Sequence, residues 1–144
     1  MEIMIRECHI QDAQNIYTLN KNEMGYDYAL EETRNKLENL LKSSHDKIFV
    51  ATIDSQVVGY VHAHDYDVIY MDHLKNIMGI AVDHNYQKRG IGKKLLNAVE
   101  QWAKEDHAKG VRLVSGETRV GAHEFYKHCG YISKKKQMHF IKLI

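Results

Sequence analysis

The sequence contains no proline and only two cysteines, Cys8 and Cys129, among its 144 residues. Since average usage of about 5% would give several prolines, turns must be formed by Gly, Asn, Asp and Ser instead. Two cysteines cannot build the disulfide framework that stabilises small secreted proteins. The chain also has no large excess of charge of either sign, because it contains 20 Lys and Arg and 19 Asp and Glu. This balance excludes a global field that would attract nucleic acid or a membrane surface.

Long hydrophobic runs are also missing. No apolar run approaches the roughly 18 residues that a membrane span needs. The first residues lack the basic and then apolar layout of a signal peptide. These absences predict a cytoplasmic protein with neither a membrane nor a nucleic acid as partner. With 44% hydrophobic and 27% charged residues, the chain has the composition of a globular protein, and its length predicts one domain over residues 1–144.

Hydrophobic periodicity predicts the order of the helices and strands. The expected helices cover residues 10–22, 29–43, 90–107 and 119–129. The expected strands cover residues 3–7, 47–53, 56–64, 74–82 and 111–117, with one or two more within 131–144. The mostly apolar run 74–82 is typical of a strand buried on both faces. This order predicts an α/β fold with a mixed central sheet of six to seven strands, flanked by about four helices.

A loop with two glycines separates the expected strand 74–82 from the next helix, which begins at Gly90-Ile91-Gly92. The first turn of a helix leaves N–H groups unpaired, and the helix dipole favours an anion there. Glycine lets the backbone approach a bulky phosphate, and three cationic side chains lie nearby, Lys88, Arg89 and Lys93. The segment therefore predicts a phosphate cradle.

Two common nucleotide motifs do not fit this loop. A Walker loop needs Ser or Thr after its lysine, but no hydroxyl residue follows Lys93. A dinucleotide-binding fingerprint needs a third glycine, and the sequence has Leu95 at that position. A plain helix start whose glycines only form the turn stays open as an alternative.

The run Gln87-Lys88-Arg89-Gly90-Ile91-Gly92 resembles the Gln/Arg-x-x-Gly-x-Gly/Ala signature of the GNAT superfamily of acetyl-CoA-dependent N-acetyltransferases. The segment from Arg119 to Tyr131 resembles the family's Asn-x-x-Ala-x-x-Phe-Tyr-x-x-x-Gly-Phe/Tyr pattern, with Arg119 at the usual Asn position. The order of elements is similar over essentially the whole chain. The resemblance implies a GNAT-like fold, acetyl-CoA as a cosubstrate and no metal.

The resemblance also implies where acetyl-CoA would bind. In the family the loop amides bind the coenzyme A pyrophosphate, and the preceding strand lies along the pantetheine arm. The residues that the resemblance assigns to this binding are Ile80, Ala81, Val82, Gln87, Lys88, Arg89, Gly90, Ile91, Gly92 and Lys93.

The resemblance implies a catalytic role for Tyr126, because it matches the family's tyrosine. In that role its hydroxyl protonates the departing thiolate after a direct, tetrahedral acetyl transfer. Packing in the core is the alternative role for this tyrosine. Glu117, at the end of the expected strand 111–117, is the candidate general base, and Asp72 and His73 are alternatives to it.

Carboxylates and tyrosines gather in residues 23–28 and 65–73. Such side chains suit a cationic amine through ion pairs and cation–π contacts, although ordinary polar loops have the same composition. The candidate substrate-binding residues are Tyr26, Asp27, Tyr28 and Asp72. The expected acceptor is a primary amine of a small molecule or peptide. His62 and His64 share one face of a strand, but two ligands fall short of a metal site, so no metal is expected.

The sequence thus predicts an enzyme, an acyl-CoA-dependent N-acetyltransferase. Two other functions stay open: a non-catalytic acyl-CoA sensor or regulatory module, and a nucleotide-binding protein that uses the same cradle for ATP. A homodimer stays open too.

Overall fold

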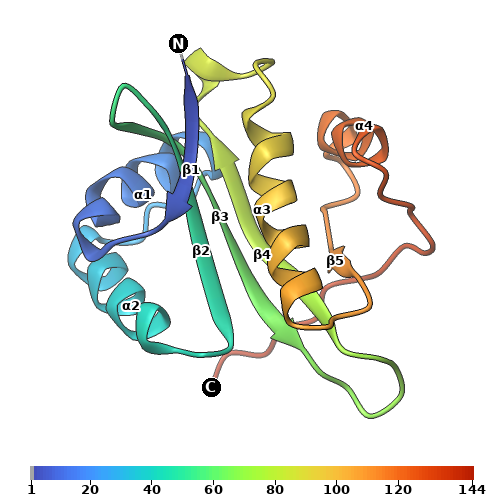
Figure 1. Ribbon diagram of the computed structural model, residues 1–144. Coiled ribbons are helices and arrows are strands. Elements are labelled where there is room, and N and C mark those ends of the chain that lie inside the picture. The colour runs from blue at the N-terminus through green and yellow to red at the C-terminus, as the bar shows by residue number, and fades with distance from the viewer. Residues whose placement is uncertain (1) are drawn as a thin grey trace. The chain divides into compact units, whose positions relative to one another are not determined.

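The structure is a computed structural model that describes residues 2–144 (Figure 1). The chain divides into two compact units, Met1–Leu113 and Val114–Ile144. The expectation of one domain over the whole chain stays a prediction. Among the described residues, no helix is both long and apolar enough to cross a membrane.

The larger unit is built on a five-stranded sheet in the order β1-β2-β3-β4-β5. Its strands are β1 (Ile3–Glu7), β2 (Asp46–Ile53), β3 (Gln56–Tyr66), β4 (Leu74–Val82) and β5 (Val111–Leu113). The first four strands pair antiparallel in chain order, and β4 pairs with β5 in parallel. The sheet is therefore mixed, as the sequence predicts. Asp54 and Ser55 join β2 to β3 with φ of 50° and 67°, the left-handed backbone that a two-residue hairpin turn requires.

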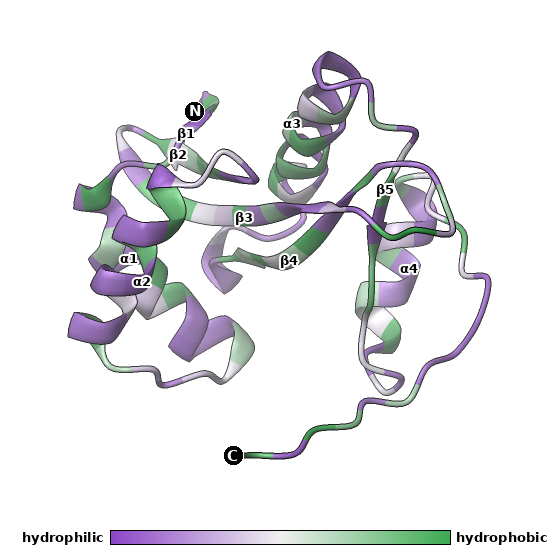
Figure 2. Cartoon of the chain, turned by 90° about the horizontal axis from the view of Figure 1, so that it is seen from below, coloured by the Kyte–Doolittle hydropathy of each residue, from purple (hydrophilic) through white to green (hydrophobic). Residues whose placement is uncertain are grey.

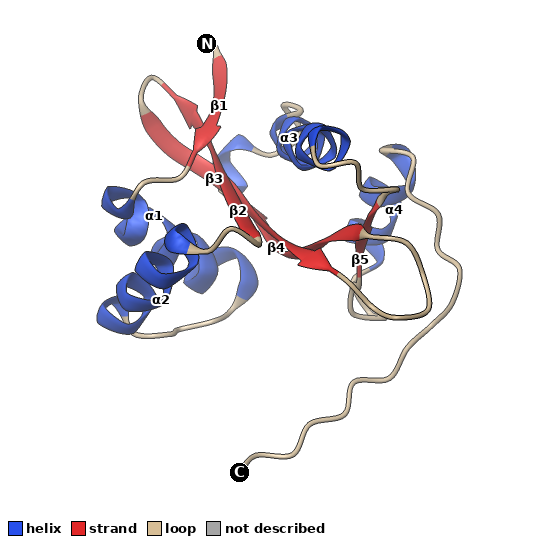
Figure 3. Cartoon of the chain, turned by 60° about the horizontal axis from the view of Figure 1, so that its bottom comes forward, coloured by secondary structure: helices blue, strands red, loops and turns tan. Residues whose placement is uncertain are grey.

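Helices cover both faces of this sheet (Figure 3). They are η1 (Ile10–Asp12), α1 (Ala13–Leu19), η2 (Asn20–Met24), α2 (Leu30–Lys42), η3 (His84–Tyr86) and α3 (Ile91–Glu105). Helices α1 and α2 pack on one face, where Ile16 and Leu37 meet Ile48 and Tyr60 in a buried cluster. Helix α3 packs on the other face of β2, β3 and β4 through an apolar stripe. Its buried residues are Ile91, Leu95, Leu96, Val99 and Ala103.

The helix expected over residues 10–22 is a composite of η1, α1 and η2. The last part is a π-helix, a form that is often found at functional sites. Gly25 ends it with φ of 78°, a conformation that favours glycine. The smaller unit contains α4 (Val120–His128), which begins after Arg119 and is followed by Gly130 with φ of 93°.

The prediction of six to seven strands is wrong for the described residues, which contain five. Strand β5 ends at Leu113 instead of Glu117, because the chain turns at Gly116, whose carbonyl accepts the Arg119 amide at 3.0 Å. Residues 131–144 form no strand, and no strand partner for them is described. Strand pairing needs a neighbour with free backbone groups, which periodicity alone does not supply.

Strand β4 has the predicted bounds but not the predicted burial on both faces. Lys75 and Ile77 are buried, whereas Met78 is 58% exposed. The fully buried Lys75 lies over the Trp102 ring, 3.8 Å from its centroid, and its ammonium donates to the carboxylates of Asp65 and Asp106. These ion pairs explain how a strand facing α3 can hold a buried lysine.

Candidate functional site

The glycine loop forms an open helix start, as the sequence predicts. Gly90 is the N-cap of α3 with φ of 81°, and no side chain accepts a hydrogen bond from the first turn. The Gly90 carbonyl accepts the Lys94 amide at 3.1 Å, so the amides of residues 91–93 point out of the helix end without an intrahelical partner. Lys88 also has a left-handed backbone, with φ of 64°. This helix end is therefore free to bind an anion.

The side chains around this helix start are arranged as an electropositive rim. Lys88, Arg89 and Lys93 are all exposed beside the first turn of α3. The Arg89 guanidinium lies over the Tyr86 ring, 5.3 Å from its centroid. Gln87 has a different role, because its Nε2 donates to the Val82 carbonyl at 3.3 Å and ties the loop to the end of β4.

Strand β4 is paired on only one side over its second half. It pairs with β5 from Lys75 to Ile77, while its pairing with β3 continues to Val82. Within the described residues, 78–82 therefore have no strand partner on the β5 side. Ile80 and Val82 are half-buried, and Ala81 is buried in the α1/α2 core, so Ala81 offers only its backbone to a ligand. This half-open strand leads directly into the glycine loop.

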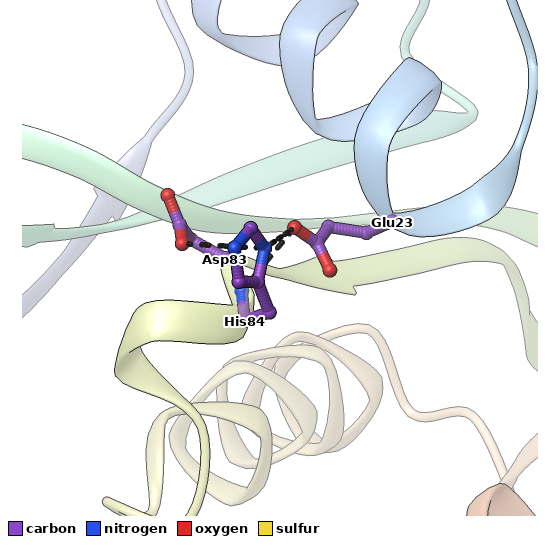
Figure 4. Close-up of side chains that lie close together, drawn as sticks. All are labelled: Glu23, Asp83 and His84. Carbon is purple, nitrogen blue, oxygen red and sulfur yellow. Dashed lines mark hydrogen bonds and ion pairs between the residues drawn. The ribbon is translucent and has the colours of Figure 1, made fainter.

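A contact between two distant segments lies at the start of this loop (Figure 4). Glu23 of η2 accepts a hydrogen bond from His84 Nδ1 at 2.8 Å and another from the His84 backbone N–H at 3.2 Å. Asp83 accepts the Asn85 amide at 2.9 Å, so both amides that open η3 are satisfied by carboxylates. The hydrogen bond and charge of Glu23 raise the pKa of His84. Nothing in the sequence indicates this pair, because its two residues lie 61 positions apart.

Three acceptor candidates lie in the loop between η2 and α2 and form one exposed group after Gly25. Tyr26 and Tyr28 are exposed, and Asp27 accepts a hydrogen bond from the Tyr17 hydroxyl at 2.9 Å. Asp72 lies in the exposed connection between β3 and β4, and no contact between it and residues 26–28 is described. The structure thus brings three of the four candidates together.

A cavity of about 150 Å³ lies beneath this group, between α2 and the sheet. Tyr28 and Lys36 line one side of it, and Tyr60 and His62 line the sheet side. The Tyr60 hydroxyl donates to the Asn20 side chain, and burial raises the pKa of Tyr60 to about 12. The cavity is smaller than the roughly 300 Å³ at which pockets for drug-sized ligands begin, so it can admit only part of a large acceptor.

The histidines of β3 have structural partners. His62 Nε2 and His64 Nδ1 both contact Asp46 Oδ1, at 2.7 Å and 2.9 Å. Asp65, His73 and Asp106 also gather in a group with metal-ligand atoms, but the Lys75 ammonium already binds both of its carboxylates. A cation therefore occupies the position that a metal ion would need.

Tyr126 lies in α4 of the smaller unit. Its buried ring packs against Phe125 and Tyr131, with centroids 5.3 Å and 6.2 Å away. Burial raises the pKa of Tyr126, which keeps the phenol protonated at neutral pH.

Glu117 lies in an exposed turn of the same unit, outside any strand, and forms an ion pair with Lys136 at 3.2 Å. The position expected for it, at the end of a strand, is wrong because β5 ends four residues earlier, at Leu113.

Comparison with known proteins identifies the relatives of this chain. Residues 10–131 match the family described as the acetyltransferase (GNAT) family. An uncharacterized N-acetyltransferase of Methanocaldococcus jannaschii is 30% identical over 110 residues, which cover 73% of this chain and 47% of that protein. The chain spans less than half the length of the curated relatives it matches.

Solved structures share the fold at low sequence identity. The aminoglycoside N-acetyltransferase AAC(6')-Iy, in complex with a CoA-containing bisubstrate analogue, superposes with a TM-score of 0.89 at 17% identity, covering 100% of both chains. The aminoglycoside 6'-N-acetyltransferase AAC(6')-Ih of Acinetobacter baumannii gives a TM-score of 0.86 at 18% identity, covering 99% of both chains. These likenesses confirm the predicted fold class.

Proposed function

The chain belongs to the GNAT acetyltransferase family, and from this premise we propose that it transfers an acetyl group from acetyl-CoA to a primary amine of a small molecule or peptide. One observation carries the proposal. The half-paired strand β4 is followed by the loop 83–90, which leads to an uncapped helix start with an electropositive rim. This arrangement fits a ligand that has an extended amide-bearing arm and a pyrophosphate in sequence, as acetyl-CoA has.

The chain's own groups would hold acetyl-CoA at its pyrophosphate and along its pantetheine arm. The amides of residues 91–93 would bind the pyrophosphate, with Lys88, Arg89 and Lys93 beside it. The free backbone groups of residues 78–82 would pair with the pantetheine arm, in the way that a strand edge accepts an extended ligand. When bound, acetyl-CoA supplies the thioester carbonyl that the amine attacks.

Acetyl transfer needs a neutral amine, donors for the oxyanion and a proton for the thiolate. An amine with a pKa of about 10.4 costs roughly 4.6 kcal/mol to deprotonate at pH 7, at about 1.36 kcal/mol per pKa unit. A backbone amide near Ile80, on the free side of β4, would stabilise the oxyanion, a contribution of about 3–4 kcal/mol for one donor. Positioned proton transfer adds a factor of roughly 10²–10⁴.

We assign the proton transfers to two residues of the smaller unit. Tyr126 would protonate the thiolate, since burial raises its pKa and keeps the phenol protonated at neutral pH. Glu117 is the proposed general base for the amine, directly or through water. The roles of Tyr126 and Glu117 can be tested separately, because each residue can be replaced while the other is kept.

The amine acceptor would bind at the exposed group formed by Tyr26, Asp27 and Tyr28, with Asp72 as a further carboxylate. Aromatic faces and carboxylates attract an ammonium group. The shared fold with aminoglycoside N-acetyltransferases supports a small-molecule amine as the acceptor. A cytoplasmic location remains our prediction from the sequence.

The test is an acceptor screen under saturating acetyl-CoA, with release of free coenzyme A thiol as the readout. We expect thiol release that depends on both the amine and acetyl-CoA. Tight binding of acetyl-CoA without turnover on any amine would instead identify a sensor. Thermal unfolding tests the other alternative, a nucleotide-binding protein that uses the same cradle for ATP. A bound ligand stabilises the native state by about 2.7 kcal/mol at 100 times its Kd. Stabilisation by ATP but not by coenzyme A would contradict the proposal.

A further inference from the structure

Tyr60 of β3 is a buried tyrosine that lines the cavity of about 150 Å³ between α2 and the sheet. Its side chain is 7% exposed, and Tyr28, one of the three exposed acceptor candidates, lines the same cavity. Figure 2 shows that α1 and α2 combine hydrophobic and hydrophilic residues, and the hydrophobic Ile16 and Leu37 line the cavity wall. The Tyr60 hydroxyl is therefore a polar group beside apolar walls, next to the proposed acceptor site.

The proton of this hydroxyl is already used. Tyr60 donates it to the side-chain carbonyl of Asn20, and burial raises the pKa of Tyr60 to about 12, so the phenol stays neutral. A phenol has one O–H donor, while its oxygen can also accept. Because the proton points at Asn20, the oxygen acts toward the cavity as an acceptor, which suits the N–H of an amine. Lys36 also lines the cavity, and its positive charge favours the neutral amine over the ammonium.

The same hydroxyl lies close to the strand that would hold acetyl-CoA. A Cβ added at Gly79 of β4 would be 3.6 Å from the Tyr60 hydroxyl oxygen. Within residues 2–144, Gly79 has no strand partner on the β5 side, and it directly precedes Ile80, near which we place the oxyanion donor. Because glycine has no side chain, the hydroxyl can approach the backbone of β4 closely. Tyr60 thus lies beside both proposed substrate sites.

Building on the acetyl transfer described above, we propose that the Tyr60 oxygen accepts a hydrogen bond from the acceptor amine during its attack on the thioester, and that Asn20 positions the hydroxyl for this role. The amine lone pair forms the C–N bond, and the C–S bond breaks when the tetrahedral intermediate collapses. One N–H proton leaves to the general base, and the thiolate takes a proton from Tyr126. A second N–H stays bonded to Tyr60, which keeps its own proton.

This contact selects amines by their number of N–H bonds. A neutral primary amine has two, one for the general base and one for Tyr60. A neutral secondary amine has one, which must leave to the base, so the Tyr60 oxygen loses its partner in the transition state. A site that hydrogen-bonds a substrate N–H discriminates strongly against an analogue that lacks it. The contact therefore makes the enzyme selective for primary amines over their N-methyl derivatives.

The first test compares two substrates of the wild type and needs no variant. They are the primary amine that gives the fastest thiol release in the acceptor screen and the N-methyl derivative of that amine. We expect kcat/KM to be at least about tenfold higher for the primary amine. Equal use of both amines overturns the role of Tyr60 and leaves acetyl transfer standing, whereas a wild type that releases no thiol with any amine overturns both.

The second test removes the hydroxyl. Tyr60→Phe should lower kcat/KM for the primary amine about tenfold, leave that for the N-methyl derivative within about twofold, and so abolish the preference. The Kd for acetyl-CoA should stay within about twofold. The control Tyr66→Phe removes a hydroxyl from the same strand, outside the cavity lining, and should keep the preference. A preference lost only because the N-methyl derivative reacts faster would show that the hydroxyl acts through its size, and would overturn the proposal.

The third test concerns Asn20 and uses the same ratio of kcat/KM values. Asn20→Ala should lower the preference, because the Tyr60 proton is then free to turn toward the cavity. Asn20→Asp keeps an acceptor oxygen and should restore the preference. Added to Tyr60→Phe, Asn20→Ala should cause no further loss, since the two residues act through one hydroxyl. A wild-type preference in Asn20→Ala, or a further loss in the double variant, overturns the positioning role of Asn20.

Discussion

Glu23 binds His84 twice, through the imidazole Nδ1 at 2.8 Å and the backbone N–H at 3.2 Å. This contact links the π-helical end of the first helical region to the loop that opens the glycine cradle (Figure 4). Because Gly25 and the acceptor candidates follow Glu23 directly, the two proposed substrate sites share this one attachment. Asp83, 3.9 Å from the same imidazole nitrogen, adds a second negative charge beside it.

The stability of the fold should depend on the protonation of His84. Its pKa is raised above the ordinary value of about 6.5 by the hydrogen bond and charge of Glu23. A histidine with a raised pKa contributes stability that is fully present below its unfolded pKa and is lost as the pH rises through its folded pKa. We therefore expect Tm to fall between about pH 6 and pH 8, measured by thermal unfolding across that range.

The variant Glu23→Gln removes the charge but keeps an acceptor, so it should flatten this part of the pH profile. The matched control is His139→Asn, a histidine of the C-terminal segment outside this contact. If Glu23→Gln keeps the wild-type slope between these pH values, His84 is not the titrating group.

Gly90 should contribute both to stability, through its left-handed backbone conformation, and to the binding of acetyl-CoA. Gly25 has nearly the same φ, 78° against 81°, and a Cβ added at either glycine would meet no atom within 4 Å. Gly25→Ala and Gly90→Ala should therefore lose similar stability, about 1 kcal/mol each in urea unfolding. Isothermal titration should show weaker acetyl-CoA binding for Gly90→Ala alone. Equal acetyl-CoA affinity in both variants would remove the loop from the binding site.

Removal of the Tyr126 hydroxyl should affect turnover and spare binding. We expect Tyr126→Phe to lower kcat at least tenfold, because the departing thiolate loses its proton donor, while the Kd for acetyl-CoA stays within twofold. Since burial raises the pKa of Tyr126, the wild-type donor remains protonated throughout the neutral range. Tyr131→Phe, which removes a hydroxyl from the neighbouring ring, serves as the control. An unchanged kcat in Tyr126→Phe would exclude this tyrosine from the mechanism.

The buried ammonium of Lys75 should be essential for stability. Lys75→Met keeps the apolar length of the side chain but removes the ammonium that pairs with Asp65 and Asp106, which we expect to lower the free energy of unfolding by about 3 kcal/mol. Burial alone would raise the pKa of Asp65, but hydrogen bonds from Lys75 and His45 hold it below the ordinary value. Its contribution is thus present above the ordinary carboxyl pKa and is lost as the pH falls through the folded pKa.

Urea unfolding of the wild type and of Lys75→Met, at pH 7 and at a pH below the ordinary carboxyl pKa of 3.8, measures both effects. Adding Asp65→Asn to Lys75→Met should recover part of the lost stability, since the uncompensated charge is removed. A double variant as unstable as the single one would argue that packing around Lys75, and not its charge, is the dominant contribution.

The local features of the fold were predictable from the sequence. Strand β4 has the predicted bounds because its apolar residues form an uninterrupted run, and the turn at Asp54-Ser55 follows from two polar residues between β-branched segments. The helix start at Gly90 was predictable because two glycines and three cations are adjacent in the chain. Each of these signals depends on neighbouring residues only.

The features that were not predicted correctly from the sequence depend on residues far away in the chain. The burial of Lys75 requires Asp106, which is 31 positions away, and a lysine in an apolar run gives no sign of that partner. The strand expected within residues 131–144 has the right composition, but no neighbouring strand for it is described within the chain. Glu117 was placed on a strand that ends at Leu113, because β propensity does not register the turn at Gly116.

The one-sided pairing of β4 divides its amide protons into two populations. Amides in residues 78–82 that point toward β3 are held in the sheet and should exchange with deuterium only when the sheet opens. Amides of the same residues that point the other way have no described strand partner and should exchange far faster, although they belong to an interior strand. Addition of acetyl-CoA should slow the second population alone, so that residue-resolved exchange rates would trace the pantetheine arm without a crystal of the complex.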